Sequence, residues 1–162
     1  MKIQNLRKKT EGFTIIEVLI VLAIAGLIML IVFLAVPALQ RNQRNTQRTS
    51  DVSRVGTGVQ NWVSNNNGAV FTAGVSNANL TAVMNDVGNL GQYTLVAGTN
   101  FKVLTGAQSA MPTLANIFIV TGAQCGANGA TVANSNTRLM AVQYATETSG
   151  GGTTGQALCK NI

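Results

Sequence analysis

The stretch that decides the fold runs from Lys8 to Leu19 and reads Lys8-Lys9-Thr10-Glu11-Gly12-Phe13-Thr14-Ile15-Ile16-Glu17-Val18-Leu19. A basic segment ends at a Gly-Phe junction, and an apolar run then continues to Val36 with one carboxylate near its start, Glu17. From Val18 to Val36 no residue is polar. A helix of about 20 apolar residues is long enough to cross a bilayer, so the sequence predicts a membrane-spanning helix here.

This segment differs from a secretory signal peptide in length and in the place of its small residue. A signal peptide usually has about 7–15 apolar residues, followed by a small-residue cleavage site. Here the apolar run is longer, and Gly12 precedes it. Cleavage after Gly12 would remove the charged leader and leave the apolar helix on the mature chain.

The short basic leader, the Gly-Phe-Thr-Ile-Ile-Glu sequence and the apolar helix together resemble the type IV pilin family, including the pseudopilins, over about residues 7 to 40. The resemblance implies an α+β fold, with a long N-terminal helical spine packed against a C-terminal antiparallel sheet of about four strands. It also implies a structural subunit, not an enzyme, and no cofactor or metal. Such a subunit polymerises through its N-terminal helix into a filament on the cell surface, for adhesion, motility or DNA uptake.

The same resemblance implies the partners and the location of the chain. The partners are copies of itself and other pilins, a prepilin peptidase, a membrane assembly platform and, before assembly, the membrane. The precursor would cross the cytoplasmic membrane once with its N-terminus inside, and the mature subunit would join an extracellular pilus. A pseudopilin of a secretion or DNA-uptake machine is the alternative within the family.

Gly12 and Phe13 form the predicted processing site. A small residue lets a protease approach the backbone closely, and the resemblance implies that a prepilin peptidase cleaves after Gly12. In the family this enzyme also methylates the new N-terminal amine, which here belongs to Phe13.

Glu17 has two interpretations. A carboxylate costs about 2.5–3.5 kcal/mol at the bilayer centre, and less near an edge. Cleavage would free the amine of Phe13 four residues earlier, and by resemblance Glu17 pairs with this amine on a neighbouring subunit during assembly. The alternative is that Glu17 is simply favoured by the positive end of the helix dipole.

One helix is predicted from Phe13 to about Asn66, and four parts follow: leader 1–12, apolar helix 13–39, amphipathic helix 40–67 and globular head 68–162. Val52, Val55, Val59, Trp62 and Val63 form an apolar stripe at helical spacing, which needs a sheet to pack on. Gly26 and Pro37 are weak points of the helix. In pilins a comparable segment loosens during assembly. Gly68 is expected to end the helix in a left-handed conformation.

The predicted head has a short helix at 80–87 and about four strands. Residues 93–96 and 101–104 are expected to form a hairpin, 115–121 and 138–145 two further strands, and 157–160 a final one. The glycine-rich segment 148–155 is expected to be a loop.

Charge and composition exclude several functions. The net charge of +6 comes mostly from the leader and from four arginines after the apolar run, so a nucleic-acid-binding head is not expected. Arg41, Arg44 and Arg48 stand at helical spacing and mark the membrane edge, where they can meet anionic headgroups. DNA contact through these three arginines is the less favoured interpretation.

The chain has no histidine, which removes His-based triads and most zinc hydrolases. An anchored exported enzyme remains a remote alternative, but Asp86 and Glu147 belong to no catalytic motif. Cys125 and Cys159 are the only cysteines, too few for a metal site. In an exported domain they indicate one disulfide, the alternative being two free thiols. They also favour an exported C-terminus and a leader that stays in the cytoplasm.

Overall fold

The computed structural model describes residues 12–71, 77–109, 112–150, 152 and 154–162. Residues 1–11 of the predicted leader lie outside the described residues. The chain divides into two compact units, one up to Leu39 and one from Gln40 to Ile162. The second unit is called the head below.

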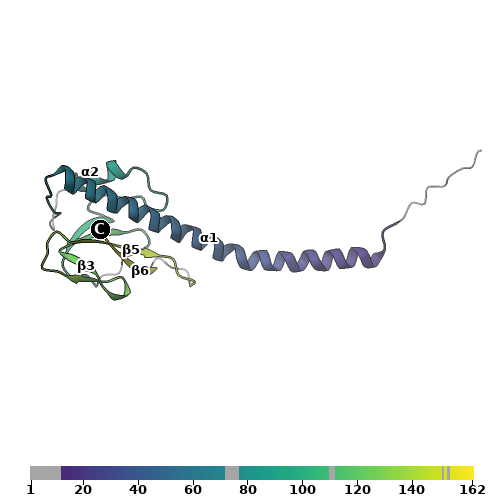
Figure 1. Cartoon of the computed structure of the whole chain (residues 1–162). Helices are drawn as coiled ribbons and strands as arrows, with labels where there is room; N and C mark the ends of the chain where they lie inside the picture. The colour runs from purple at the N-terminus through teal and green to yellow at the C-terminus, as the bar shows by residue number, and fades with distance from the viewer. Residues whose placement is uncertain (1–11, 72–76, 110–111, 151, 153) are drawn as a thin grey trace, which may run out of the picture. The chain divides into compact units, whose positions relative to one another are not determined.

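Helix α1 spans Ile15–Asn65, 51 residues, so the long N-terminal helix is confirmed (Figure 1). It is assigned without a break through Pro37. The loosening of the segment between Gly26 and Pro37 during assembly stays a prediction. The helix ends where expected: the N–H of Gly68 donates to the carbonyl of Val63 at 2.8 Å, and Gly68 has a φ of +75°.

The head contains a four-stranded sheet with the order β1-β2-β5-β6. Its strands are β1 (Phe101–Thr105), β2 (Ile117–Thr121), β5 (Met140–Thr146) and β6 (Gln156–Asn161). Strands β2, β5 and β6 pair in antiparallel fashion, whereas β1 pairs with β2 in parallel, with Phe101 opposite Ile117. The predicted α+β layout with a sheet of about four strands is confirmed, with one parallel pair in it.

The predicted hairpin of residues 93–96 and 101–104 is wrong, because residues 93–96 form no strand. The side chain of Asn100 bonds the backbone groups that a hairpin partner would have bonded. Its Oδ1 accepts from the N–H of Val96 at 2.7 Å, and its Nδ2 donates to the carbonyl of Thr94 at 2.8 Å. The segment therefore folds back on itself, and β1 is free to pair with β2.

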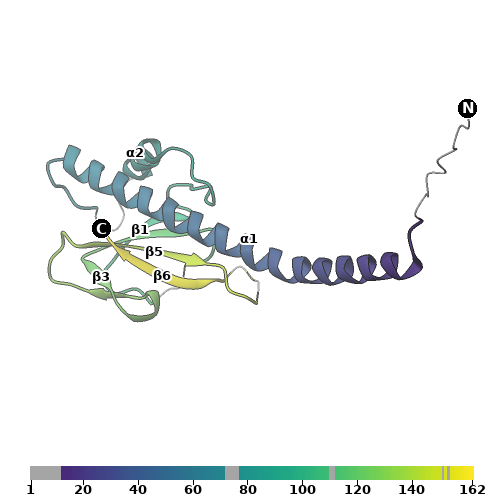
Figure 2. The ribbon, with the colours of Figure 1, turned by 45° about the vertical axis from the view of Figure 1, so that its right-hand side comes forward.

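Helix α1 and the short helix α2 (Asn77–Val87) lie on one side of the sheet, and the views of Figures 1 and 2 agree on this. The predicted stripe provides the helix side of the core: Val52, Val55 and Val59 are at most 1% exposed, and Trp62 and Val63 pack against them. They meet core residues from α2 and the strands: Leu80, Val83, Val87, Phe101, Ile117, Ile119, Met140, Val142 and Tyr144.

Two glycines in α1 allow this close packing. A Cβ at Gly56 would lie 2.7 Å from Cγ2 of Ile162, and a Cβ at Gly58 would lie 2.5 Å from Cγ2 of Val87. The end of the chain and the end of α2 thus both reach the helix where it has no side chains.

A second, two-stranded sheet was not predicted. It pairs β3 (Ala123–Cys125) with β4 (Thr131–Ala133), and the short 3-10 helix η1 (Ala127–Gly129) joins them. Figure 2 shows β3 on the side of the main sheet away from α1 and α2. The head is therefore built in three layers, with the two helices outermost on one side and the small ribbon on the other.

Candidate functional site

A small polar site lies at the N-terminal end of α1, before the apolar part of the helix. Gly12, Phe13 and Thr14 precede the helix and are exposed, and Phe13 is 90% exposed. The predicted cleavage site therefore lies in non-helical backbone. Backbone outside a helix is open to a protease, because helical backbone engages its carbonyl groups in internal hydrogen bonds.

Thr14 and Glu17 form a capping box at the first turn of α1. The N–H of Thr14 donates to Oε2 of Glu17 at 2.8 Å, and the Thr14 hydroxyl donates to the same oxygen at 2.7 Å. The N–H of Glu17 in turn donates to the Thr14 hydroxyl at 3.4 Å. A Thr followed three residues later by Glu is the usual sequence of this motif, because each residue bonds backbone groups that the first turn leaves free.

The capping box fixes the direction of the carboxylate without using all of it. Both bonds from Thr14 go to Oε2, and Oε1 has no hydrogen bond with any residue that the structure describes. Oε1 can therefore accept a hydrogen bond from a cation that approaches the helix start. Glu17 can thus stabilise the start of its own helix and still pair with an amine of a neighbouring subunit.

Beyond this site the surface of α1 is apolar as far as Leu39. Phe13 and the large apolar side chains from Ile15 to Leu39 are at least 40% exposed. Among the described residues, α1 is the only helix long and apolar enough to cross a membrane, judged by length and composition. An exposed apolar surface of this length needs lipid or protein to cover it.

The arginines after the apolar run are mostly engaged inside the head. Arg44 makes a two-pronged contact with Glu147: Nε donates to Oε1 at 2.8 Å, and Nη2 donates to Oε2 at 2.7 Å. Arg48 is 7% exposed, donates from Nη1 to the carbonyl of Leu114 at 2.5 Å, and lies 3.6 Å from Glu147. Both residues therefore hold the head together. Arg48 is buried and does not reach phosphate or headgroups, whereas the side chain of Arg44 is 44% exposed, so its contact with headgroups stays a prediction. Within the described part of the chain, Arg41 makes no hydrogen bond or ion pair.

Glu147 is fastened to α1 by its backbone as well as its side chain. Its N–H donates to Oδ1 of Asn45 at 2.7 Å, and its carbonyl accepts from Nδ2 of Asn45 at 3.0 Å. The hydrogen bond from Arg44 holds the pKa of Glu147 below its ordinary value. The end of β5 is thus tied to one and a half turns of helix through Arg44, Asn45 and Arg48.

Two buried charged residues of α1, Asp51 and Arg48, contact the loop before β1. Asp51 is fully buried; its Oδ1 accepts from Nε2 of Gln47 at 3.0 Å, and its Oδ2 accepts from the N–H of Gln92 at 2.8 Å. One turn earlier, the guanidinium of Arg48 lies 5.2 Å from the centre of the Tyr93 ring. Burial raises the pKa of Tyr93, and Arg48 opposes this rise. These contacts hold the loop before β1 onto the helix.

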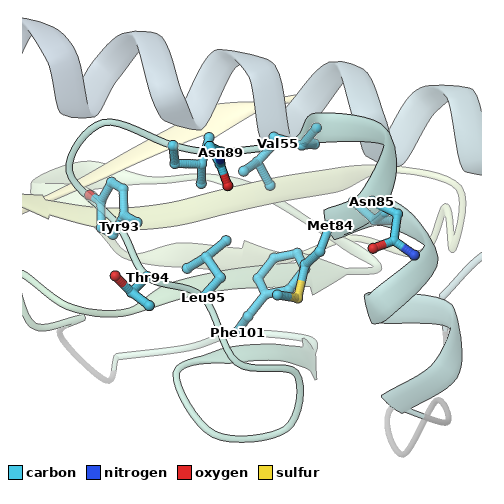
Figure 3. A pocket seen from close by; sticks show the side chains of 12 residues that line it. Val55, Met84, Asn85, Asn89, Tyr93, Thr94, Leu95 and Phe101 are labelled. Carbon is cyan, nitrogen blue, oxygen red and sulfur yellow. The ribbon is translucent and has the colours of Figure 1, made fainter.

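A half-open cavity of about 440 Å³ lies in the head at the C-terminal end of α2 (Figure 3). Figure 3 shows Met84, Leu95 and Phe101 lying together in it, with Asn85 on the side of α2 and Tyr93 farther along the loop. Its lining contains no Asp, Glu, Lys or Arg side chain. The cavity therefore offers no general acid or base at neutral pH.

The other residues with chemical potential lie apart from one another. Asp86 accepts a hydrogen bond from Nδ2 of Asn61 at 3.0 Å, far from the contacts of Glu147 with Arg44. Among the described residues, no three His, Cys, Asp or Glu side chains gather as a metal site requires. Cys125 and Cys159 form a disulfide with a Cα–Cα distance of 5.5 Å, joining β3 to β6.

One comparison with known families covers the N-terminal site. A family model described as "Prokaryotic N-terminal methylation motif" matches residues 7–33. The match covers the Gly12–Phe13 junction, the Thr14–Glu17 box and most of the apolar run. The comparisons with curated proteins and with solved structures found no match.

Proposed function

Residues 7–33 carry the prepilin signature of the type IV pilin and pseudopilin family, and from this premise we propose that the chain is a structural subunit that polymerises through α1 into a type IV pilus filament. One observation carries the proposal. The first half of α1, up to Leu39, exposes its apolar side chains, and the only charged residue in that half is Glu17, which the capping box holds at the start of the helix.

During assembly the lipid around the apolar half of α1 would be replaced by the apolar helices of neighbouring subunits. The membrane holds the apolar helix of the precursor at little cost, because its side chains match the hydrocarbon. In a filament the helices of other copies surround it. Oε1 of Glu17 would then accept from the amine of Phe13 on a neighbour, and this pairing sets the axial position of each new subunit.

The processing step follows from the same signature. A prepilin peptidase would cut between Gly12 and Phe13, and would methylate the amine of Phe13. The cut removes the basic leader and creates the positive charge that Glu17 meets. The precursor would lie in the cytoplasmic membrane with the leader inside, and the head would be exported.

The decisive experiment compares Glu17→Gln with Glu147→Gln in cells that make the full chain. Both changes remove one carboxylate, but only the first lies at the helix start. We expect Glu17→Gln to lower the yield of sheared filaments at least tenfold while the amount of subunit in the membrane stays unchanged. Glu147→Gln should leave the yield within about twofold. A normal filament yield from Glu17→Gln would overturn the role of this carboxylate in assembly.

The length of the filament separates the two members of the family. A long surface fibre identifies a pilin, whereas a short periplasmic filament identifies a pseudopilin of a secretion or DNA-uptake machine. Electron microscopy of cells with and without the gene distinguishes them, and cells without any filament of this subunit would contradict both.

A further inference from the structure

The ribbon formed by β3, η1 and β4, residues 123–133, lies on the face of the main sheet that is turned away from α1 and α2 (Figure 2). It contacts β5 and β6 through β3 and η1. Successive side chains of a strand point to opposite faces of the sheet. Val142 and Tyr144 of β5 belong to the core on the helix side, so Ala141 and Gln143 point toward the ribbon. The head thus has a second interior layer, which the ribbon closes.

The ribbon buries little apolar surface. Among residues 123–133, which the structure describes throughout, the buried ones are Ala123 and Thr131. Val132 has the largest apolar side chain of the ribbon and is 51% exposed. None of these residues belongs to the apolar core on the helix side. Because apolar burial is the main favourable contribution to folding, the ribbon is held weakly by its side chains.

Hydrogen bonds attach both strands of the ribbon to the rest of the head. The N–H of Cys125 donates to Oδ1 of Asn161 at 2.7 Å, and the hydroxyl of Thr131 accepts from the N–H of Gln108 at 2.9 Å. The N–H of Thr131 donates in turn to the carbonyl of Gln108 at 3.2 Å. Each of these groups can bond water when the ribbon opens, so each bond contributes little net free energy.

Gln143 favours opening of the second layer. Its side chain is 1% exposed, and its Nε2 donates to the carbonyl of Gly129 at 2.9 Å. Its Oε1 is buried and has no hydrogen-bond partner among the described residues. A buried acceptor without a partner costs free energy. Opening the ribbon removes this cost, because water can then bond Oε1.

The base of the ribbon is closed independently of its contact with the sheet face. The N–H of Gly122 donates to the carbonyl of Leu139 at 2.8 Å, and the carbonyl of Gly122 accepts from the N–H of Asn134 at 2.8 Å. Beside this base, Thr121 at the end of β2 pairs with Met140 at the start of β5. The ribbon can therefore leave the sheet face while β2 and β5 stay paired.

One disulfide opposes this opening. It joins Cys125 in β3 to Cys159 in β6, 34 residues further along the chain. Both cysteines are partly exposed, so the bond lies within reach of a soluble dithiol. A dithiol that gives two electrons and two protons to the bond breaks S–S, leaves two thiols on the head and itself becomes a disulfide.

We propose that the ribbon is a redox-controlled layer of the head: the Cys125–Cys159 disulfide fastens it to the sheet, and without the disulfide it opens while the core on the helix side stays folded. A two-stranded hairpin is at best marginally stable alone, so the opened ribbon also loses its own strand pairing. The oxidation of the two thiols then decides whether the head carries this outer surface. The inference concerns the head alone and does not rest on the proposed filament.

Hydrogen exchange of the full chain in detergent, measured by mass spectrometry, tests the proposal. The natural chain is compared with the same chain reduced by dithiothreitol and with the double variant Cys125→Ser, Cys159→Ser. In the oxidised chain the hydrogen-bonded amides of residues 123–133 should exchange at least about 100-fold more slowly than in an unfolded chain. Without the disulfide they should exchange within about tenfold of the unfolded rate, whereas amides of β2 and β5 stay slowed at least about 100-fold.

Two results of this comparison would overturn the proposal. In one, the ribbon amides stay slowed by more than about tenfold when the disulfide is absent. In the other, the amides of β2 and β5 lose their protection together with the ribbon and the fluorescence of Trp62 changes, which shows that the head unfolds as one unit.

Thr131→Val provides the matched control, because it removes a hydrogen-bonding hydroxyl of the ribbon, nearly preserves the side-chain shape and keeps the disulfide. In the oxidised form of this variant the ribbon amides should stay slowed at least about 100-fold. A ribbon that opens in this variant as far as in the reduced natural chain would show that the disulfide is not what fastens it.

Discussion

The guanidinium of Arg48 lies 5.2 Å from the centre of the Tyr93 ring, in a part of the head where both side chains are at least nine-tenths buried. The same guanidinium bonds the carbonyl of Leu114 and lies near Glu147. One arginine of α1 therefore connects the loop before β1, the loop before β2 and the end of β5.

Replacing Arg48 should destabilise the head. An arginine that only contacted lipid headgroups would have no such effect. Arg48→Met should lower the free energy of unfolding by about 2 kcal/mol, since hydrogen bonds to charged groups contribute about 1.5–3 kcal/mol. The control is Arg41→Met, which removes the same charge where no described residue is a hydrogen-bond or ion-pair partner, and should cost under about 0.5 kcal/mol. Urea unfolding in detergent, followed by Trp62 fluorescence, measures both. Equal effects would show that Arg48 has no special structural role.

Acid should loosen the end of β5 through Glu147. Because Arg44 lowers the pKa of Glu147 in the folded head, the ionised carboxylate contributes stability above its unfolded pKa of about 4.3. This contribution is lost as the pH falls below that value and through the folded pKa. The unfolding free energy of the natural chain should therefore decline more steeply between pH 5 and about pH 3 than that of Glu147→Gln. Parallel pH profiles for the two chains would contradict the ion pair.

Gly58 should resist substitution by alanine, even though alanine favours helix. Alanine gains about 1 kcal/mol in helix propensity, but its Cβ would lie 2.5 Å from Cγ2 of Val87. Overpacking typically costs about 1–3 kcal/mol, so a net loss of about 1 kcal/mol is expected. Gly26→Ala is the matched change in the same helix, with nothing within 4 Å of the new Cβ. It should leave unfolding of the head unchanged, and a stabilised Gly58→Ala head would contradict the close contact.

Processing at Gly12 should be visible in the mass of the mature chain. Protein isolated from cells should begin at Phe13 and carry one added methyl group on its amine. Gly12→Leu should keep the leader, because a bulky side chain prevents close approach of the protease to the backbone. Intact-mass spectrometry reads both results, and an unprocessed natural chain would contradict the proposed maturation.

The sequence predicted correctly those features for which a local residue pattern is compatible with only one structure. The apolar run and the stripe from Val52 to Val63 gave the helix and its buried face, because both follow from periodicity and hydrophobicity alone. The Thr14–Glu17 box was also present in the sequence as Thr-x-x-Glu. Its spacing could have shown that Glu17 caps its own helix.

Other features depend on partners that are distant in the chain. Arg44 and Arg48 follow the apolar run, and their spacing is typical of residues at a membrane edge. Their partner Glu147 lies 103 residues from Arg44, which no local pattern reveals. Residues 93–96 are of types common in strands, but the side chain of Asn100 bonds their backbone. The small β3–β4 ribbon escaped detection because each of its strands has only three residues.

The contact between Ile162 and Gly56 has a practical consequence for labelling. The side chain of Ile162 packs on the backbone of α1 at Gly56, and its N–H donates to the carbonyl of Met140 in β5. A fluorescent or affinity tag fused at Ile162 would therefore disturb the packing between α1 and the sheet. The turn at Ser149–Gly150 is exposed and bears none of these contacts. An epitope inserted at that turn should let the subunit be followed in living cells without disturbing its fold.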